Sequence, residues 1–307
     1  NGSLIALEAA TGTQLWRTNV LQRFNARNIN WGLSESPLID GRQLIVNAGG
    51  GGASIVAIDK NNGNVIWKSL DDEAGYSSAM VVEAGGVRQY ILLTGEAAVG
   101  VRADNGKELW RYRRVSNSTA NVATPVVHGD QVFVSSDYGT GGGLLKLAAN
   151  GDGVNADEVY FNRDMRNHYN TPVLIGDYLY GYSSRILTCM NFATGEVAWQ
   201  DRSVGKGQVI AADGLLYLLS EDGVVGLAEA TPEGYRERDA IAKTALSTIS
   251  LTHVLHEFLQ ETRVAQNLVI LKTNSGSANT VALVLDTAGF SEIVGTVAGD
   301  DTIFVAA

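Results

Sequence analysis

The sequence predicts a mostly β fold, a β-propeller of four-stranded blades followed by a small α+β domain. Three observations point to it: a phrase in which tryptophan follows glycine by four residues, a second phrase that begins at proline, and a change of pattern after residue 236. Repeats of roughly 40 to 50 residues are typical of propeller blades. With 307 residues the chain has room for one large domain and a smaller one.

The Gly-to-Trp phrase contains four of the five tryptophans, and each copy follows a short apolar run such as residues 4–7. This order predicts strand, turn and strand, with the glycine supplying the positive φ of a tight turn. A degenerate copy has Tyr160 where tryptophan is expected, and a last copy covers residues 209–227. We interpret the four tryptophans as structural residues of the blades: Trp16, Trp67, Trp110 and Trp199.

The second phrase begins with Ser-Pro or Thr-Pro at Pro37, Pro125 and Pro172 and ends in a glycine four residues later. Proline has no N–H for the sheet ladder, so it is tolerated where a strand begins. Together the two phrases make four antiparallel strands, and successive tryptophans 51 and 43 residues apart fit one blade each. The sequence therefore predicts about five to six blades, the first of them partial, and leaves open whether the ring is truncated.

Composition excludes several classes of protein. Lys and Arg number 23 against 33 Asp and Glu, and a net charge of -10 disfavours direct binding to nucleic acid. No apolar run reaches the roughly 18 residues of a membrane-spanning helix. Cys189 is the only cysteine, so the chain cannot form an internal disulfide or a CxxC metal or redox site, and we expect no metal.

The repeated phrase resembles that of the pyrroloquinoline quinone-like β-propellers over residues 1–236. That family includes quinoprotein dehydrogenases and BamB-like outer-membrane assembly scaffolds, and in it the tryptophans dock between neighbouring blades. The resemblance implies a scaffold that binds other proteins through its faces, in the periplasm or outside a bacterial cell. The alternative it leaves is a quinoprotein oxidoreductase.

The dehydrogenases of this family carry a vicinal disulfide against the quinone and a calcium site. A single cysteine cannot form that disulfide, and the segment around Asp152 lacks the later glutamate of a calcium loop. Glycine clusters at 49–52 and 141–143 lack the Lys-Ser or Lys-Thr of a phosphate loop. We therefore expect no catalytic residues, no bound pyrroloquinoline quinone and no other cofactor.

One polar cluster precedes the strand predicted at residue 171. It contains Arg163, Arg166 and His168, close to where propellers gather their channel-facing loops. A ligand site is one interpretation, and a solvated loop whose side chains satisfy turns is the other.

After residue 236 the pattern changes, and we expect a linker over 237–249. Leu251, Val254, Leu255, Phe258 and Leu259 have the spacing of an amphipathic helix. A strand over 268–272, a helix over 276–287 and strands over 293–298 and 302–306 follow. A unit of this size leaves an apolar face open, which favours oligomerisation.

Residues 250–307 resemble the C-terminal domain of bacterial arginine repressors, most clearly in the run from Glu292 to Val305 around Gly299-Asp300-Asp301. The resemblance implies trimers or hexamers in which paired aspartates hold L-arginine, with carboxylates as bidentate partners of the guanidinium. Asn279 stands where the family usually has glutamine, and the family's winged helix is absent. The implied ligand residues are Asn279, Asp286, Asp300 and Asp301.

Two histidines, His253 and His256, lie three residues apart on the first predicted helix, where a solvated face is favoured over a zinc site. The arginine-repressor resemblance implies the cytoplasm, whereas the propeller implies the periplasm or exterior. A natural fusion, a designed chimera and an assembly error all remain open. The function predicted is a non-catalytic scaffold with an oligomerisation and arginine-binding domain.

Overall fold

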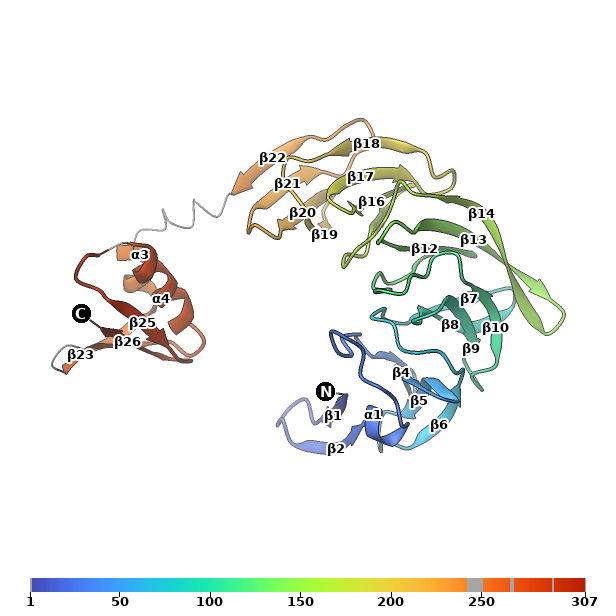
Figure 1. Ribbon diagram of the computed structural model, residues 1–307, viewed down its shortest axis with the longest axis horizontal. Coiled ribbons are helices and arrows are strands. Elements are labelled where there is room, and N and C mark those ends of the chain that lie inside the picture. The colour runs from blue at the N-terminus through green and yellow to red at the C-terminus, as the bar shows by residue number, and fades with distance from the viewer. Residues whose placement is uncertain (1, 242–250, 266–267, 289, 307) are drawn as a thin grey trace. The chain divides into compact units, whose positions relative to one another are not determined.

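The computed structural model describes residues 2–241, 251–265, 268–288 and 290–306 (Figure 1). Its contacts group into two compact units, Asn1–Glu221 with Gly226–Ala240 and Asp222–Val225 with Ile241–Ala307. Strands dominate the first unit, and helices and strands make up the second. The predicted fold class is confirmed.

The first unit contains five four-stranded antiparallel sheets and one two-stranded sheet, each built from consecutive strands. The two-stranded sheet pairs β1 (Ser3–Leu7) with β2 (Gln14–Asn19), and α1 (Val20–Arg23) follows it. The five larger sheets are β3 (Leu38–Asp40), β4 (Gln43–Gly50), β5 (Ala53–Asp59) and β6 (Val65–Ser69); β7 (Met80–Ala84), β8 (Val87–Leu93), β9 (Ala98–Arg102) and β10 (Glu108–Tyr112); β11 (Val126–His128), β12 (Gln131–Ser136), β13 (Gly141–Asn150) and β14 (Gly153–Asn162); β15 (Val173–Ile175), β16 (Tyr178–Ser183), β17 (Ile186–Asn191) and β18 (Val197–Asp201); β19 (Gly207–Ala212), β20 (Leu215–Ser220), β21 (Val225–Glu229) and β22 (Glu237–Ile241).

The two sequence phrases correspond to the two hairpins of a blade. Strands β3, β11 and β15 each begin one residue after a proline of the second phrase. The Gly-to-Trp phrase joins the third strand to the fourth, and its glycine has a left-handed backbone, with φ of +74° at Gly63 and +75° at Gly106. Only glycine adopts this conformation at little cost.

Aromatic side chains connect most blades to the next. The indole N–H of Trp16 donates to the carbonyl of Lys60 at 2.8 Å, and that of Trp67 donates to the carbonyl of Ala103 at 3.0 Å. The phenol of Tyr160, in the degenerate copy, donates to the carbonyl of Phe192 at 2.9 Å. Each acceptor lies three residues before the glycine of the following blade, so one contact recurs between blades.

Trp199 makes the same contact, because Thr231 lies three residues before Gly234 of the following sheet, whereas Trp110 bonds differently. The indole N–H of Trp199 donates to the carbonyl of Thr231 at 2.7 Å, within the turn before β22. That of Trp110 donates to the side-chain oxygen of Gln89 inside its own sheet, at 2.7 Å. The sheet that follows Trp110 has the long β13–β14 hairpin in place of the Gly-to-Trp turn, which removes the usual acceptor.

Strand β8 shows how a central blade is buried on both faces. Tyr90 and Leu92 pack in one core cluster with Ile45 and Ile55 of the preceding sheet. Ile91 and Leu93 pack in another, with Val132, Val134 and Leu145 of the following sheet. Because the side chains of a strand alternate between faces, one strand supplies both interfaces.

The second unit is a four-stranded antiparallel sheet with two helices. The sheet order is β23, β24, β26, β25, and its core joins Leu271, Ile303 and Val305 of the sheet to Val281 and Leu285 of α4. Its elements are α3 (Leu251–Phe258), β23 (Leu259–Ala265), β24 (Leu268–Thr273), α4 (Ala278–Thr287), β25 (Gly295–Ala298) and β26 (Thr302–Ala306).

Two details of the sequence interpretation were wrong. Leu259, expected on the first helix, begins strand β23, which pairs with β24 from Leu259 opposite Thr273 to Ala265 opposite Leu268. Most residues of β23 are exposed, so its sequence lacks the alternation of apolar and polar residues that predicts a strand. The first residues of the expected linker, Glu237–Ile241, form β22, whose neighbour Arg236 pairs with Glu229; residues 242–250 lie outside the described residues.

Candidate functional site

One face of the first unit carries the segments that join the last strand of one sheet to the first strand of the next. Four of the five segments are longer than the hairpin turns, and these four border two adjoining hollows. Irregular segments held by a rigid scaffold are where binding residues usually lie. The four long connections are residues 24–37, 70–79, 113–125 and 163–172, and the short one is residues 202–206.

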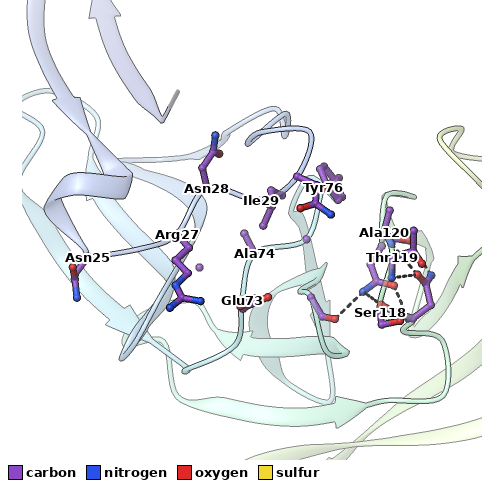
Figure 2. Close-up of a pocket in the computed structure, with 16 residues that line it drawn as sticks. Asn25, Arg27, Asn28, Ile29, Glu73, Ala74, Tyr76, Ser118, Thr119 and Ala120 are labelled. Carbon is purple, nitrogen blue, oxygen red and sulfur yellow. Dashed lines mark hydrogen bonds between the residues drawn. The ribbon is translucent and has the colours of Figure 1, made fainter.

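The first hollow is a polar cavity of about 390 Å³. Figure 2 shows Asn28 and Ile29 on one side, Ser118 and Thr119 on the other, and Glu73 between them. These residues come from three different connections, so three consecutive blades build the cavity. We call it the polar cavity below.

One wall of the polar cavity is fixed by its own hydrogen bonds. The side-chain oxygen of Asn117 accepts from the backbone N–H groups of Thr119 and Ala120, both at 2.8 Å. The side-chain amide of Asn121 donates to the carbonyls of Thr94 and Gly95 at 3.2 and 2.9 Å. This wall is therefore preorganised, and its amides are already engaged.

The opposite wall, residues 25–30, is different. The side chains of Arg27, Asn28 and Asn30 line the cavity and are exposed. In the described part of the chain, none of the three makes a hydrogen bond or ion pair with another residue. The cavity thus offers a guanidinium and two amides to a ligand, opposite a rigid wall.

The second hollow, of about 330 Å³, is an aromatic groove. Tyr76 and Ala120 line both hollows, so the groove adjoins the polar cavity. The groove is lined by Trp31, Ser34, Tyr76, Ala120, Val122, Tyr138, His168 and Tyr169.

Trp31 is the tryptophan outside the Gly-to-Trp phrase, and the sequence interpretation passed over it. Trp31 is 64% exposed, whereas Trp67 and Trp110 are buried. Its ring centroid lies 5.8 Å from that of Tyr76, and its backbone N–H donates to the Tyr76 hydroxyl at 3.3 Å. The signal that could have identified it was its position outside the repeat.

Tyr138 and His168 stand at another part of the groove. The Tyr138 hydroxyl and Nε2 of His168 are 2.7 Å apart, with ring centroids at 5.1 Å. Tyr138 has φ of +56°, a strained backbone for a residue with a side chain, and strain of this kind concentrates at functional sites. Burial lowers the pKa of His168, so its ring is neutral at physiological pH.

The three residues of the predicted polar cluster are separated. His168 lines the aromatic groove, but Arg163 and Arg166 do not line either hollow. Arg163 is exposed, and the backbone N–H of Arg166 donates to the Ser183 hydroxyl at 3.1 Å. The cluster is therefore not one site in the structure, although one of its members belongs to the groove.

Glu35, near the end of the first connection, has a buried carboxyl group. Its Oε1 accepts from the backbone N–H of Asn47 at 2.6 Å, and its buried Oε2 has no partner among the described residues. Burial raises the pKa of Glu35 to about 8, so the group carries a proton at neutral pH. The Asn47 amide in turn donates to the carbonyl of Leu93 in the next sheet at 3.4 Å.

In the second unit, Gly299-Asp300-Asp301 forms the turn between β25 and β26. The carbonyl of Asp300 accepts from the backbone N–H of Gly276 at 3.0 Å, which places the turn at the start of α4. The carboxylate of Asp301 lies 3.2 Å from Nζ of Lys272. Hydrogen bonds from Thr302 and Lys272 lower the pKa of Asp301, so it is ionised.

The four residues implied for arginine binding do not all meet within one copy. Asn279 lies in the first turn of α4, beside the Asp300 turn, and is exposed. Asp286 lies seven residues further along the helix, about 10 Å at 1.5 Å per residue, where its carboxylate accepts from the Thr296 hydroxyl at 2.9 Å. One copy therefore presents two separate sets of ligand groups.

Both units expose apolar side chains. On the end sheet β19–β22, Ile210 and Leu219 are 67% and 52% exposed. In the second unit, Val297 is 70% exposed and lies directly opposite Phe304, itself 45% exposed, on the sheet face away from the buried Ile303 and Val305. Such patches are typical of protein interaction surfaces.

The described residues hold no group of three or more histidines, cysteines and acids placed to bind a metal ion. Cys189 is buried, and burial raises the pKa of its thiol to about 11. The side chain of His253 lies outside what the structure describes. Among the residues placed, no helix is long and apolar enough to cross a membrane.

Comparison with known proteins agrees with the architecture. The family model of the outer membrane protein assembly factor BamB matches residues 1–201, about two thirds of the sequence. The chain belongs to the BamB family. The crystal structure of BamB from Moraxella catarrhalis aligns with 99% of this chain and 78% of that one, with a TM-score of 0.60 and 14% sequence identity. At this identity the likeness establishes the fold.

The C-terminal residues match a second family model, the C-terminal domain of the arginine repressor, over 255–307. The arginine repressor of Koribacter versatilis is 52% identical over 56 residues, 18% of this chain and 38% of the repressor. That of Solibacter usitatus is 59% identical over 51 residues, 17% of this chain and 35% of the repressor. The chain thus spans less than two fifths of these relatives.

Proposed function

We propose that the chain is a non-catalytic binding scaffold whose C-terminal domain joins copies of the protein and binds L-arginine. The observation that carries the proposal is the apolar sheet face of that domain. Val297 and Phe304 are cross-strand partners on this face, and a domain of this size gains stability by covering such a surface. The match to arginine repressors supports self-association as trimers or hexamers.

Arginine binding is proposed at the Asp300 and Asp301 turn. A guanidinium pairs well with carboxylates in the same plane, and each charge-assisted hydrogen bond contributes about 1.5 to 3 kcal/mol. Because Asp286 and Asn279 are separated along α4, assembly would bring one set from each of two copies to the ligand. Binding should then require the oligomer.

The propeller is proposed to bind other proteins. The end sheet exposes a row of apolar side chains, Ile210, Tyr217 and Leu219. In the inner blades, apolar sheet faces of this kind are buried against one another. A partner with an apolar face fits the exposed row. We propose neither a direct nucleic-acid contact nor a quinone cofactor, since one cysteine cannot form the vicinal disulfide of quinoprotein dehydrogenases.

Native mass spectrometry of the purified chain, with and without millimolar L-arginine, tests the proposal. A trimer or hexamer is expected, with the larger species favoured by arginine because a ligand stabilises the state that binds it. A monomer in both conditions at micromolar concentration contradicts it.

The non-catalytic assignment has its own test. Addition of calcium and pyrroloquinoline quinone to the chain should produce no dye reduction with alcohols or sugars. Turnover at an ordinary enzyme rate, about 1 per second or faster, would contradict the assignment.

A further inference from the structure

The polar cavity and the aromatic groove share two lining residues, Tyr76 and Ala120, and so adjoin each other. One half presents aromatic rings, and the other presents amides and a guanidinium. A ligand that fills both halves must have flat apolar faces and a rim of hydrogen-bonding groups. Small-molecule sites typically combine apolar and aromatic walls with a few polar groups that fix the ligand's orientation.

The aromatic half favours ring-shaped ligands. Trp31 and Tyr138 are 64% and 46% exposed, so their rings have faces available for contact. The backbone of Tyr138 is held in a strained conformation that displays its ring at the groove, next to His168. A pyranose ring has a face of C–H groups that packs on an aromatic face, and burying this face removes apolar area from water.

The polar half favours hydroxyl groups. An asparagine side chain offers two N–H donors and a carbonyl acceptor in one plane, and a vicinal pair of hydroxyls can donate to the acceptor and accept from a donor together. Asn28 and Asn30 lie in the wall whose side chains are free, and Arg27 adds further donors. The opposite wall is already fixed by Asn117 and Asn121, so little ordering is needed on binding.

The charges favour a neutral ligand. The guanidinium of Arg27 and the carboxylate of Glu73 line the same cavity and balance each other. Burial holds His168 in its neutral form in the groove. An anion would meet Glu73 there, and a cation would meet Arg27, while the protein as a whole carries a net charge of -10.

An extended peptide fits these features less well. Peptides commonly pair their backbone with the exposed edge of a sheet. Both hollows are lined by connections and hairpins at strand ends, and the backbone of the fixed wall at Thr119 and Ala120 already donates to Asn117. Side-chain recognition, in contrast, is available from both halves.

We propose that the two adjoining hollows together bind a neutral oligosaccharide, with sugar rings stacked on Trp31 and Tyr138 and hydroxyls held by Arg27, Asn28 and Asn30. The site goes beyond the proposed function and does not depend on it. Arginine binding and self-association concern the second unit and are measured separately.

The test begins with the full chain applied to an array of neutral oligosaccharides of two to six residues, together with proline-rich peptides. The best ligand is then titrated while tryptophan fluorescence and heat are recorded. We expect millimolar or tighter binding with a change in fluorescence, because Trp31 is the exposed tryptophan of the groove. Trp31→Ala and Asn28→Ala should each weaken binding about fivefold or more.

Both variants change exposed residues, so their melting temperatures should match that of the wild type. Tyr217→Ala, which removes a partly exposed ring from the end sheet, is the matched control and should leave the affinity unchanged. Failure of every oligosaccharide to bind at millimolar concentration overturns the proposal. Binding that is indifferent to Trp31→Ala, or binding of a peptide but of no oligosaccharide, overturns it as well.

Discussion

Strands β8 and β20 occupy the same position in their sheets, yet solvent reaches them differently. In β8, Tyr90, Ile91 and Leu92 are fully buried, because a sheet packs against each face. In β20, Leu218 is buried while Leu219 is 52% exposed. Each strand contains a continuous apolar run, Tyr90 to Leu93 in β8 and Leu215 to Leu219 in β20. The repeat therefore encodes a blade with two apolar faces, and the presence of a neighbouring sheet decides which face is buried.

The largest expected effect is the loss of unfolding free energy when a core side chain is truncated. Leu92→Ala should lower the free energy of unfolding by about 2 to 5 kcal/mol, because it leaves a cavity between two sheets. Leu219→Ala in the end sheet should cost less than about 1 kcal/mol, because solvent already reaches that side chain. Urea denaturation of both variants checks this. Equal losses would mean that the end sheet is covered in solution.

The second test concerns the aromatic contact between blades. A Cβ atom added at Gly106 would lie 2.4 Å from the ring of Trp67, whereas at Gly12 it would meet nothing within 4 Å. Both glycines have positive φ, +75° and +71°, so the backbone strain of about 1 kcal/mol is common to both. Gly106→Ala should therefore destabilise the chain clearly more than Gly12→Ala does.

Thermal melts of the two glycine variants provide the measurement. The difference between them isolates the contact of Trp67 with the next blade, since the turn conformation is shared. A smaller loss for Gly106→Ala than for Gly12→Ala would show that Trp67 does not dock as described.

The third test uses the buried, protonated carboxyl group of Glu35. The folded pKa of Glu35, about 8, exceeds its ordinary value of 4.5, so the native state retains a proton that the unfolded state releases between these pH values. Stability from this group is complete below pH 4.5 and falls as pH rises towards 8, by up to about 1.4 kcal/mol per unit. Glu35→Gln should flatten this decline.

The comparison requires urea denaturation of the wild type and Glu35→Gln at several pH values from 5 to 9. Other titrating groups contribute equally to both proteins, so the difference reports on Glu35. Parallel curves would contradict the assignment of a protonated, buried carboxyl group beside Asn47.

The smallest effect concerns the second unit. Asp301→Asn keeps the shape of the side chain and removes one charge, so we expect the affinity for L-arginine to fall about tenfold. Asp104→Asn, an exposed acid of the first unit, is the control and should have no effect. Calorimetry on confirmed oligomers decides: equal affinities for wild type and Asp301→Asn would leave the residues as an ordinary turn.

Much of the fold could be predicted because the repeat uses residue types that fit only particular backbone conformations or packing positions. Glycine at a positive φ, proline before a strand and tryptophan between blades each leave a mark in the sequence. Strand β23 left none, because its pairing with β24 is a tertiary contact and most of its side chains face solvent. Glu237–Ile241 was missed for the same reason, since charged residues hide its place in a sheet.

The site was harder to predict than the fold. His168 was identified from its loop, but the companions it has in the groove, Trp31 and Tyr76, lie about 90 to 140 residues away in the sequence. Their meeting depends on how successive blades align their connections. Arg163 and Arg166 are close to His168 in the sequence, yet neither of them lines the groove that His168 lines.

The most direct test of the account is the mass of the particle when each apolar surface is disrupted. Sedimentation should show a trimer or hexamer for the wild type, a monomer for Val297→Asp, and an unchanged oligomer for Ile210→Asp. The proposed self-association uses the C-terminal sheet, and the end sheet is proposed to bind a different protein partner. A monomeric wild type, or dissociation by Ile210→Asp while Val297→Asp remains assembled, would contradict it.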